Sequence, residues 1–242
     1  LLARPNIMPS SSFHHRVKYY RLRSNMKYVS LTINGKKVTA REGEQLLWVA
    51  LDNGFYIPNL CGLRENPEPL AACRLCWVEI EGRNRPVTAC TETVKEGMVV
   101  NTKGENAIRL VKSGFELLMA SHALDCGHCA KNGNCELQKI AHHLRVSLKP
   151  RGLRKILRDL PVDDSHPLFT YDPNKCVLCG RCVWVCRHHL NVGAFGFAHR
   201  GFQRRVTTFG DEPMDKSACD ECHECILACP TGALTLKLKN QK

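Results

Sequence analysis

The chain of 242 residues is 43% hydrophobic and 24% charged, which is typical of a soluble globular protein with one to three small domains. Its most apolar stretch, residues 110–120, is interrupted by Lys112, Ser113 and Glu116 and falls short of the roughly 18 residues that a membrane span needs. The net charge of +12 favours docking on an acidic partner or solubility, and the few aromatic residues near the basic ones argue against nucleic-acid binding.

The fifteen cysteines are the unusual feature of the composition. An odd number would leave one thiol unpaired in a disulfide scaffold, and no segment has the charged, apolar and small-residue order of a secretory signal. The thiols are therefore better interpreted as metal ligands.

The first 25 residues contain five basic residues and no acidic one. We expect residues 1–26 to form a basic disordered tail. An upstream extension of a chain that starts at Met26 explains this tail better than an organelle presequence does.

Regular patterning starts with alternating hydrophobicity over residues 28–33, which predicts a strand. Asn34-Gly35 predicts a two-residue hairpin turn, and a return strand begins near Val38. The apolar spacing of residues 42–53 predicts a helix. Up to about residue 102 we predict the order β-β-α-β-β, with short strands expected at residues 77–80, 87–89 and 98–101.

The first group of cysteines lies around these predicted elements with the spacing C-x11-C-x2-C-x13-C. Four thiolates suit a [2Fe–2S] cluster with two ligands per iron, and the closely spaced pair can reach one iron from a single loop. Structural zinc is the alternative, but zinc usually takes two short Cys-x2-4-Cys pairs, and only one pair here is short. The candidate ligands are Cys61, Cys73, Cys76 and Cys90.

Apolar spacing predicts two further helices, over residues 105–121 and 136–144. Between them lies a group with the spacing H-x3-C-x2-C-x5-C, namely His122, Cys126, Cys129 and Cys135. Three thiolates and one imidazole can hold a [4Fe–4S] cluster, and the less negative site should have a higher potential than four thiolates give. Taken alone, the segment fits a Cys3His zinc site equally well, and His128 is an alternative ligand.

Residues 144–165 carry six basic side chains around Pro150-Arg151-Gly152. We expect an exposed connector between two metal-binding domains, with a partner-docking surface as the alternative.

The last part of the chain contains the motif C-x2-C-x2-C-x3-C twice. Such a repeat is typical of two-cluster bacterial ferredoxins, in which three close thiolates and the fourth cysteine of the other copy hold each [4Fe–4S] cluster. Two departures, Arg187 in place of proline and His223 at the position of Gly180, can alter solvent access or hydrogen bonding at the second cluster. We expect one cluster on Cys176, Cys179, Cys182 and Cys229, and the other on Cys186, Cys219, Cys222 and Cys225.

These four groups use all fifteen thiols, so no cysteine is left as a catalytic nucleophile. No G-x-G-x-x-G follows a predicted strand, and Gly193-Ala-Phe-Gly196 lacks that spacing. We therefore expect no catalytic residue and no flavin or NAD site on this chain.

Taken together, the spacing of the first four cysteines, the His122 set and the doubled motif resemble a known family. This family is the N-terminal iron–sulfur module of the large peripheral subunit of respiratory complex I, shared with iron-only hydrogenases and NAD-linked formate dehydrogenases. The resemblance covers about residues 27–240 and is nearest to the small diaphorase subunits of NAD-reducing nickel–iron hydrogenases. The complete second motif argues against complex I's own subunit, and an end at Lys242 argues against the longer hydrogenases and formate dehydrogenases.

We accordingly expect an α+β fold with a β-grasp [2Fe–2S] ferredoxin domain and a helical His/Cys3 [4Fe–4S] domain. A basic linker and a C-terminal two-cluster, bacterial-ferredoxin-like domain follow. The expected boundaries are 27–103, 104–145, 146–166 and 167–242.

The resemblance implies an electron-transfer subunit of an NAD(P)H-linked oxidoreductase with one [2Fe–2S] and three [4Fe–4S] clusters. Single electrons would pass between a flavin- and NAD(P)H-binding subunit, near the first domain and the His122 site, and a second catalytic subunit at the two-cluster end. We expect this second partner to be a hydrogenase. A formate dehydrogenase, an electron-bifurcating complex or a complex I-like NADH dehydrogenase is the alternative setting. We expect a cytoplasmic location.

Overall fold

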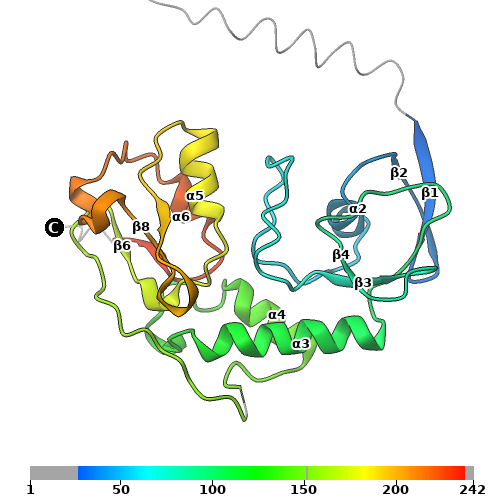
Figure 1. Ribbon diagram of the computed structural model, residues 1–242, viewed down its shortest axis with the longest axis horizontal. Helices are drawn as coiled ribbons and strands as arrows, with labels where there is room; N and C mark the ends of the chain where they lie inside the picture. Colours follow the sequence, from blue (N-terminus) through cyan, green and yellow to red (C-terminus); the bar gives the residue numbers. More distant parts are fainter. Residues whose placement is uncertain (1–26, 151, 238–242) are drawn as a thin grey trace, which may run out of the picture.

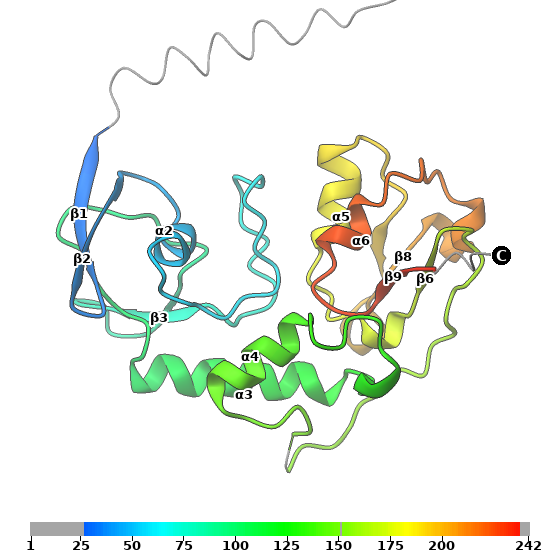
Figure 2. The ribbon, with the colours of Figure 1, turned by 180° about the vertical axis from the view of Figure 1, so that it is seen from behind.

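The computed structural model describes residues 27–150 and 152–237, so the predicted tail lies outside the described residues. Two lobes lie side by side on a pair of helices, α3 (Glu105–Ala120) and α4 (Glu136–Leu144), as both ribbon views show (Figures 1 and 2). Within the described part of the chain, no helix is long and apolar enough to cross a membrane.

The first lobe contains a five-stranded mixed sheet in the order β2-β1-β5-β3-β4. The β1–β5 pair is parallel, and the other three pairs are antiparallel. The predicted hairpin is confirmed: Asn34 and Gly35, with φ of 50° and 80°, form the left-handed turn that joins β1 to β2. The strands are β1 (Tyr28–Ile33), β2 (Lys36–Arg41), β3 (Trp77–Ile80), β4 (Val87–Thr88) and β5 (Val99–Asn101).

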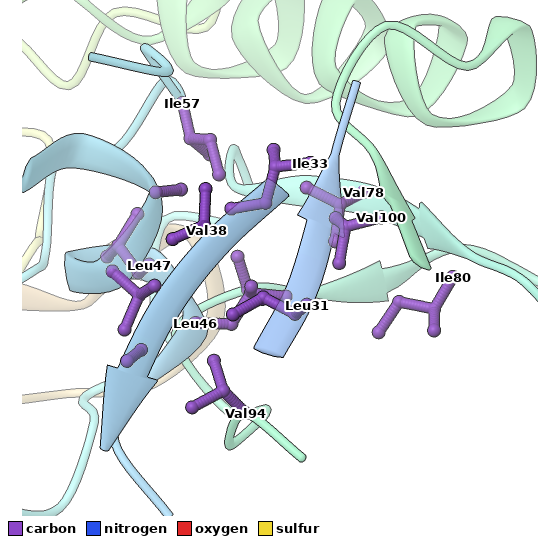
Figure 3. Close-up of a cluster of buried hydrophobic side chains, with 14 of the residues drawn as sticks. Leu31, Ile33, Val38, Leu46, Leu47, Ile57, Val78, Ile80, Val94 and Val100 are labelled. Atoms are coloured by element: carbon purple, nitrogen blue, oxygen red, sulfur yellow. The ribbon is translucent and has the colours of Figure 1, made fainter. Parts of the chain in front are cut away.

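Helix α2 (Leu46–Asp52) packs its buried residues Leu46 and Leu47 on this sheet. They contact the core that Leu31, Ile33 and Val100 form, together with other aliphatic side chains (Figure 3). Full burial of one such side chain stabilises the fold by about 1.5–3 kcal/mol, so this small core can hold the lobe together.

Two details of the first lobe differ from the prediction. The helix was expected from Glu42 but begins only at Leu46, because Gly43 has a φ of +82° and Gln45 pairs with Thr93 in an isolated β-bridge. The three short strands predicted after the helix are all present, so the order β-β-α-β-β was wrong only in counting two of them.

Helices α3 and α4 confirm the two other predicted helices, and their apolar faces meet in a second core. Phe115 of α3 and Ile140 of α4 are fully buried there. The same core contains Cys61 and Cys73 from the first lobe and Cys179 from the second. The second core therefore joins the two lobes and the helices that carry them.

The connector after α4 is mostly exposed, as expected, but a few of its residues contact the rest of the protein. Val146 and Leu148 pack against the second core, and the Ile156 N–H donates to the Ala120 carbonyl at 2.8 Å. Arg154 remains exposed, as predicted for a basic linker. We call residues 156–160, which cross from the end of α3 to the second lobe, the strap.

The second lobe contains two small antiparallel sheets, β6 with β9 and β7 with β8. A third core, which includes Phe169 and Phe195, lies between them and the two short helices α5 and α6. The strands are β6 (Phe169–Tyr171), β7 (Gly196–Ala198), β8 (Arg205–Thr207) and β9 (Leu234–Leu236), and the helices are α5 (Arg181–Trp184) and α6 (Glu224–Ala228). The remaining helical turns are η2 (Cys126–His128), η3 (Pro173–Lys175), η4 (Val185–His189), η5 (Gly201–Gln203), η6 (Phe209–Asp211) and η7 (Met214–Lys216).

Candidate metal centres

All fifteen cysteines are free thiols in the structure. Among residues 27–150 and 152–237, no three His, Cys, Asp or Glu side chains converge as the ligands of a single ion would. The predicted ligands instead gather in four groups of four around the loops that connect the elements.

The first group lies beside the sheet of the first lobe. Cys61 and Cys73 belong to the loop between α2 and β3, Cys76 directly precedes β3, Cys90 follows β4, and all four are buried. The Sγ atoms of Cys61 and Cys73 are 3.4 Å apart, and the Leu60 N–H donates to the Cys73 sulfur at 3.4 Å. The four thiols thus come from two loops, with Cys76 and Cys90 in the core of the first lobe and Cys61 and Cys73 in the second core.

Hydrogen bonding joins these thiols in two pairs. The bond to Cys73 lowers the pKa of Cys61 to about 6, and the same bond, with burial, raises the pKa of Cys73. In the second pair, the bond between the two thiols lowers the pKa of Cys90 and raises that of Cys76. The contacts therefore pair Cys61 with Cys73 and Cys76 with Cys90 within the group.

The second group surrounds a small cavity at the junction of the helices and the second lobe. His122 follows the end of α3, Cys126 is the first residue of η2, Cys129 follows η2, and Cys135 precedes α4. Lys175 and Gly232 of the second lobe complete the lining. A Cβ at Gly232 would collide with the Cys129 sulfur, so only glycine allows the backbone to approach the site this closely.

His122 fits a ligand role better than His128 does. Its Nδ1 atom is buried and has no hydrogen-bond partner among the described residues. Burial, helped by the charge of Lys175, lowers the pKa of His122 to about 4, so the imidazole is neutral, as metal ligation requires. His128 is exposed, and its Nδ1 lies 2.8 Å from the Asp125 carboxylate.

The third group lies in the second lobe around a small apolar cavity. Cys176, Cys179, Cys182 and Cys229 all line it, together with the ring of Tyr171. Burial raises the pKa of Cys176 to about 11 and that of Cys179 to about 12. The cysteine that comes from the second copy of the motif thus lies with the three from the first.

The fourth group combines Cys186 with Cys219, Cys222 and Cys225. Cys186, Cys219 and Cys225 share the third core, where η4 contacts α6, so the fourth cysteine of the first copy lies near the second copy. The Ala194 N–H donates to the Cys186 sulfur at 3.2 Å. The structure therefore brings the cysteines together in the crossed arrangement.

The two ligand loops share one backbone course. Leu178 and Gly180 have φ of 54° and 81° in the first copy, and Glu221 and His223 have φ of 62° and 66° in the second. His223 thus adopts the left-handed conformation that Gly180 adopts without strain.

The other departure, Arg187, also has a structural explanation. After Cys186 the chain continues through η4, which a proline would interrupt, whereas Pro230 follows the last residue of α6 and its cap.

Three basic side chains near the ligands had not been assigned a role. Lys175 lines the His122 cavity, Arg181 lies beside Cys179, and Arg158 of the strap donates to the backbone of Cys176. Membership of the basic run was the only sequence signal for Arg158, and nothing in that run indicates which side chain turns inward.

Comparison with family models divides the chain into three matched regions. Residues 26–105 match a 2Fe-2S iron-sulfur cluster binding domain, and residues 112–149 match the NADH-ubiquinone oxidoreductase-G iron-sulfur binding region. Residues 166–235 match the ferredoxin-like domain of NADH-quinone oxidoreductase subunit 3.

Similar proteins include the alpha subunit of an NADPH-Fe(3+) oxidoreductase from Geobacter sulfurreducens, 38% identical over 86% of this chain but 24% of that subunit. The chain therefore spans about a quarter of that relative's length. The gamma subunit of the NAD-reducing hydrogenase HoxS from Cupriavidus necator is 30% identical over 86% of this chain and 87% of its own. A crystal structure of NAD+-reducing [NiFe]-hydrogenase in the H2-reduced state aligns with a TM-score of 0.79, 29% identity and coverage of 87% and 88% of the two chains.

Proposed function

The chain belongs to the family of iron–sulfur subunits that includes the gamma subunit of the NAD-reducing hydrogenase HoxS, and from this premise we propose that it carries single electrons between two catalytic partners. One partner binds flavin and NAD(P)H, and the other is a hydrogenase. The chain itself contributes no substrate site. Its location in this proposal is the cytoplasm, where the nicotinamide substrate is available.

The grouping of the ligands is the observation that carries the proposal. It supports a [2Fe–2S] cluster on Cys61, Cys73, Cys76 and Cys90 and a [4Fe–4S] cluster on His122, Cys126, Cys129 and Cys135. It supports two further [4Fe–4S] clusters, one on Cys176, Cys179, Cys182 and Cys229 and one on Cys186, Cys219, Cys222 and Cys225.

When bound, these clusters supply one-electron transfer at potentials that depend on their charge, hydrogen bonds and exposure. The chain's own residues tune these quantities. The backbone N–H groups of Leu60, Leu178 and Ala194 donate to ligand sulfurs and stabilise their negative charge. The second core keeps water from the sulfurs of Cys61 and Cys73.

We also propose the three-domain layout. A β-grasp ferredoxin domain at residues 27–103 agrees with the mixed sheet under α2, and a helical domain at 104–145 agrees with α3 and α4. A two-cluster ferredoxin domain at 167–242 agrees with the doubled loops around α5 and α6. The segment 146–166 links the last two and includes the strap.

Iron and acid-labile sulfide analysis of the anaerobically purified chain, together with low-temperature EPR, tests the cluster assignment. We expect about 14 iron and 14 sulfide per chain, the content of one [2Fe–2S] and three [4Fe–4S] clusters. Zinc without sulfide or EPR signals after reconstitution would instead identify a metal-stabilised binding module.

Electron donors test the relay role. Dithionite should reduce the clusters of the isolated chain, and NADH should leave them oxidised until the flavin subunit is added. Rapid reduction by NADH of the chain alone would contradict the proposal, because it would locate nicotinamide chemistry on this chain.

A complex I-like NADH dehydrogenase is the second candidate setting. It is favoured by the matches of residues 112–149 and 166–235 to regions of NADH-quinone oxidoreductases. Isolation of the complex through a tag on this chain separates the two settings. Hydrogen-dependent reduction of NAD(P)+ supports the hydrogenase, whereas quinone reduction by NADH without hydrogenase activity supports the dehydrogenase.

A further inference from the structure

Arg158 of the strap turns into the second lobe and donates only to backbone carbonyls. Its Nη2 atom lies 2.8 Å from the carbonyl oxygen of Cys176 and 2.8 Å from that of Pro173. Its Nη1 atom donates to the Arg204 carbonyl at 3.1 Å. One side chain thus ties the strap to the first ligand of the third group and to the start of β8.

No carboxylate of the described residues compensates the charge of Arg158. Lys175 nearby is paired with Asp172 at 3.2 Å, whereas Arg181, beside Cys179, also has a buried Nε atom without a hydrogen-bond partner among the described residues. The Arg158 Nε atom is also buried without a hydrogen-bond partner within the described chain. A partly buried, unpaired cation is costly unless a negative charge lies nearby.

Arg158 lies between two of the proposed cluster sites. The strap begins at Ile156, which is bound to Ala120 shortly before His122, and it reaches Cys176 through Arg158 itself. Burial dominates the pKa of both ligands, raising that of Cys176 and lowering that of His122. The charge of Arg158 acts on both in the direction expected of a nearby cation, since it favours the Cys176 thiolate and disfavours a protonated His122.

We propose that Arg158 is the counter-charge of the [4Fe–4S] cluster on Cys176, Cys179, Cys182 and Cys229 and raises its reduction potential. The inference rests on the proposed function, because it requires the cluster to be present. It explains why the partly buried guanidinium donates only to three carbonyl oxygens. The anionic cluster and its four thiolates would supply the negative charge that the polypeptide does not.

The physical basis is electrostatic. Each electron added to a cluster increases its negative charge by one, and a fixed cation stabilises the reduced state more than the oxidised state. Removal of the cation therefore makes the cluster harder to reduce. Because low local dielectric strengthens this interaction, the effect should exceed that of an exposed cation on the same segment.

The test is an EPR-monitored redox titration of the full chain with all clusters assembled, comparing the wild type with Arg158→Met. We expect one [4Fe–4S] signal to titrate at a lower potential. Its reduced-to-oxidised ratio at a given potential should fall about tenfold, which is about 59 mV for a one-electron couple. Arg154→Met, which removes the same charge from an exposed position four residues earlier in the chain, is the matched control and should leave all potentials unchanged.

Two further variants separate charge from anchoring. Arg158→Lys keeps the charge and should retain a potential close to the wild type, whereas Arg158→Gln keeps hydrogen-bond donors and should show the lowered potential. If Arg158→Met loses the cluster, the Lys and Gln variants decide the question. Equal potentials in the Lys and Gln variants, or equal potentials in the Met variants of Arg158 and Arg154, would overturn the inference.

Failure of the proposed function is distinguishable from failure of the inference. A wild-type chain without iron and sulfide contradicts the proposed function before any variant is measured. A chain with the expected clusters whose reduction potentials do not change when Arg158 is replaced contradicts the inference alone.

Discussion

The two copies of the C-x2-C-x2-C-x3-C motif have the same cysteine spacing and the same left-handed backbone positions but differ in the charge of the side chains between the cysteines. Between its first three cysteines, the first copy has the apolar Val177 and Leu178 and the basic Arg181. The second copy has Asp220, Glu221 and Glu224 at the corresponding positions. Val177 is buried, whereas Asp220 and Glu221 are exposed.

This difference indicates how a duplicated ligand loop can yield two unequal redox sites. The spacing of the cysteines determines which atoms can meet, and the side chains between them determine how much water and charge surround those atoms. The largest consequence concerns the ligands themselves.

Replacement of a buried ligand should damage the fold more than replacement of a half-buried one. Cys182→Ala removes a buried sulfur of α5, and we expect the loss of one cluster and a fall of about 4 kcal/mol or more in the free energy of unfolding. Cys222→Ala should lose the same amount of iron with a smaller fall in stability, because Cys222 is only partly buried. Iron analysis and thermal unfolding measure both, and equal destabilisation would remove the proposed distinction.

The reduction potential of the proposed cluster should be higher at the first copy, with its basic side chain, than at the acidic second copy. We expect the cluster of the first copy to be reduced first, because acidic side chains disfavour added electrons at the second. Asp220→Asn keeps the 3.3 Å hydrogen bond to the Cys222 N–H, removes one charge and should raise the second cluster's potential by a few tens of millivolts. Asp215→Asn, an exposed change on η7, is the control, and a shift of equal size in this control would contradict the explanation.

The left-handed residue of each loop provides a comparison of backbone strain. Gly180→Ala should destabilise the protein by about 1–2 kcal/mol, since its φ is 81° and the new Cβ would lie an ordinary 3.4 Å from Phe197. His223→Gly should stabilise it by about 0.5–1 kcal/mol, because relief of the same strain exceeds the added entropy of glycine in the unfolded chain. Chemical unfolding of the cluster-loaded chain measures both, and a destabilising His223→Gly would show that the imidazole itself is needed.

Replacement of Asp211, between the two copies, should have the smallest effect on the free energy of unfolding, and this effect should depend on pH. The hydrogen bond from Arg205 is the main cause that lowers its pKa to about 2. A depressed pKa contributes stability above the unfolded value of about 3.8, and this stability is lost as the pH falls through 2. Because the pair is exposed, Asp211→Asn should cost no more than about 1 kcal/mol at neutral pH. The free energies of unfolding of the variant and the wild type should converge near pH 2. An undiminished difference at this pH would show that the stability does not come from the lowered pKa of Asp211.

Local signals predicted the regular elements well. Asn34-Gly35 permits a left-handed turn that most residues disfavour, and the apolar spacing over residues 105–121 matches a helix. Neither element depends on distant partners. The error at Glu42–Gln45 has the opposite cause. Gln45 pairs with Thr93, far along the chain, and this contact is invisible in a helical pattern.

The candidate sites were predictable in composition but not in geometry. Repeated cysteine spacing indicates the ligand groups because short loops limit which sulfurs can meet. The contact of Cys61 with Cys73, the approach of Gly232 to Cys129 and the inward turn of Arg158 all join distant segments. Such contacts depend on tertiary packing, which residue identity alone does not encode.

The approach of Gly232 to Cys129 has a consequence for the order of maturation during synthesis. The His122 site takes its four candidate ligands from the middle of the chain, yet its wall includes Gly232, and the Pro230 carbonyl accepts a hydrogen bond from the Glu136 N–H beside Cys135. These residues leave the ribosome long after the cysteines they enclose. The wall of the middle site is therefore completed only after residues 230–232 have been synthesised, at the same stage as Cys229 completes the third group.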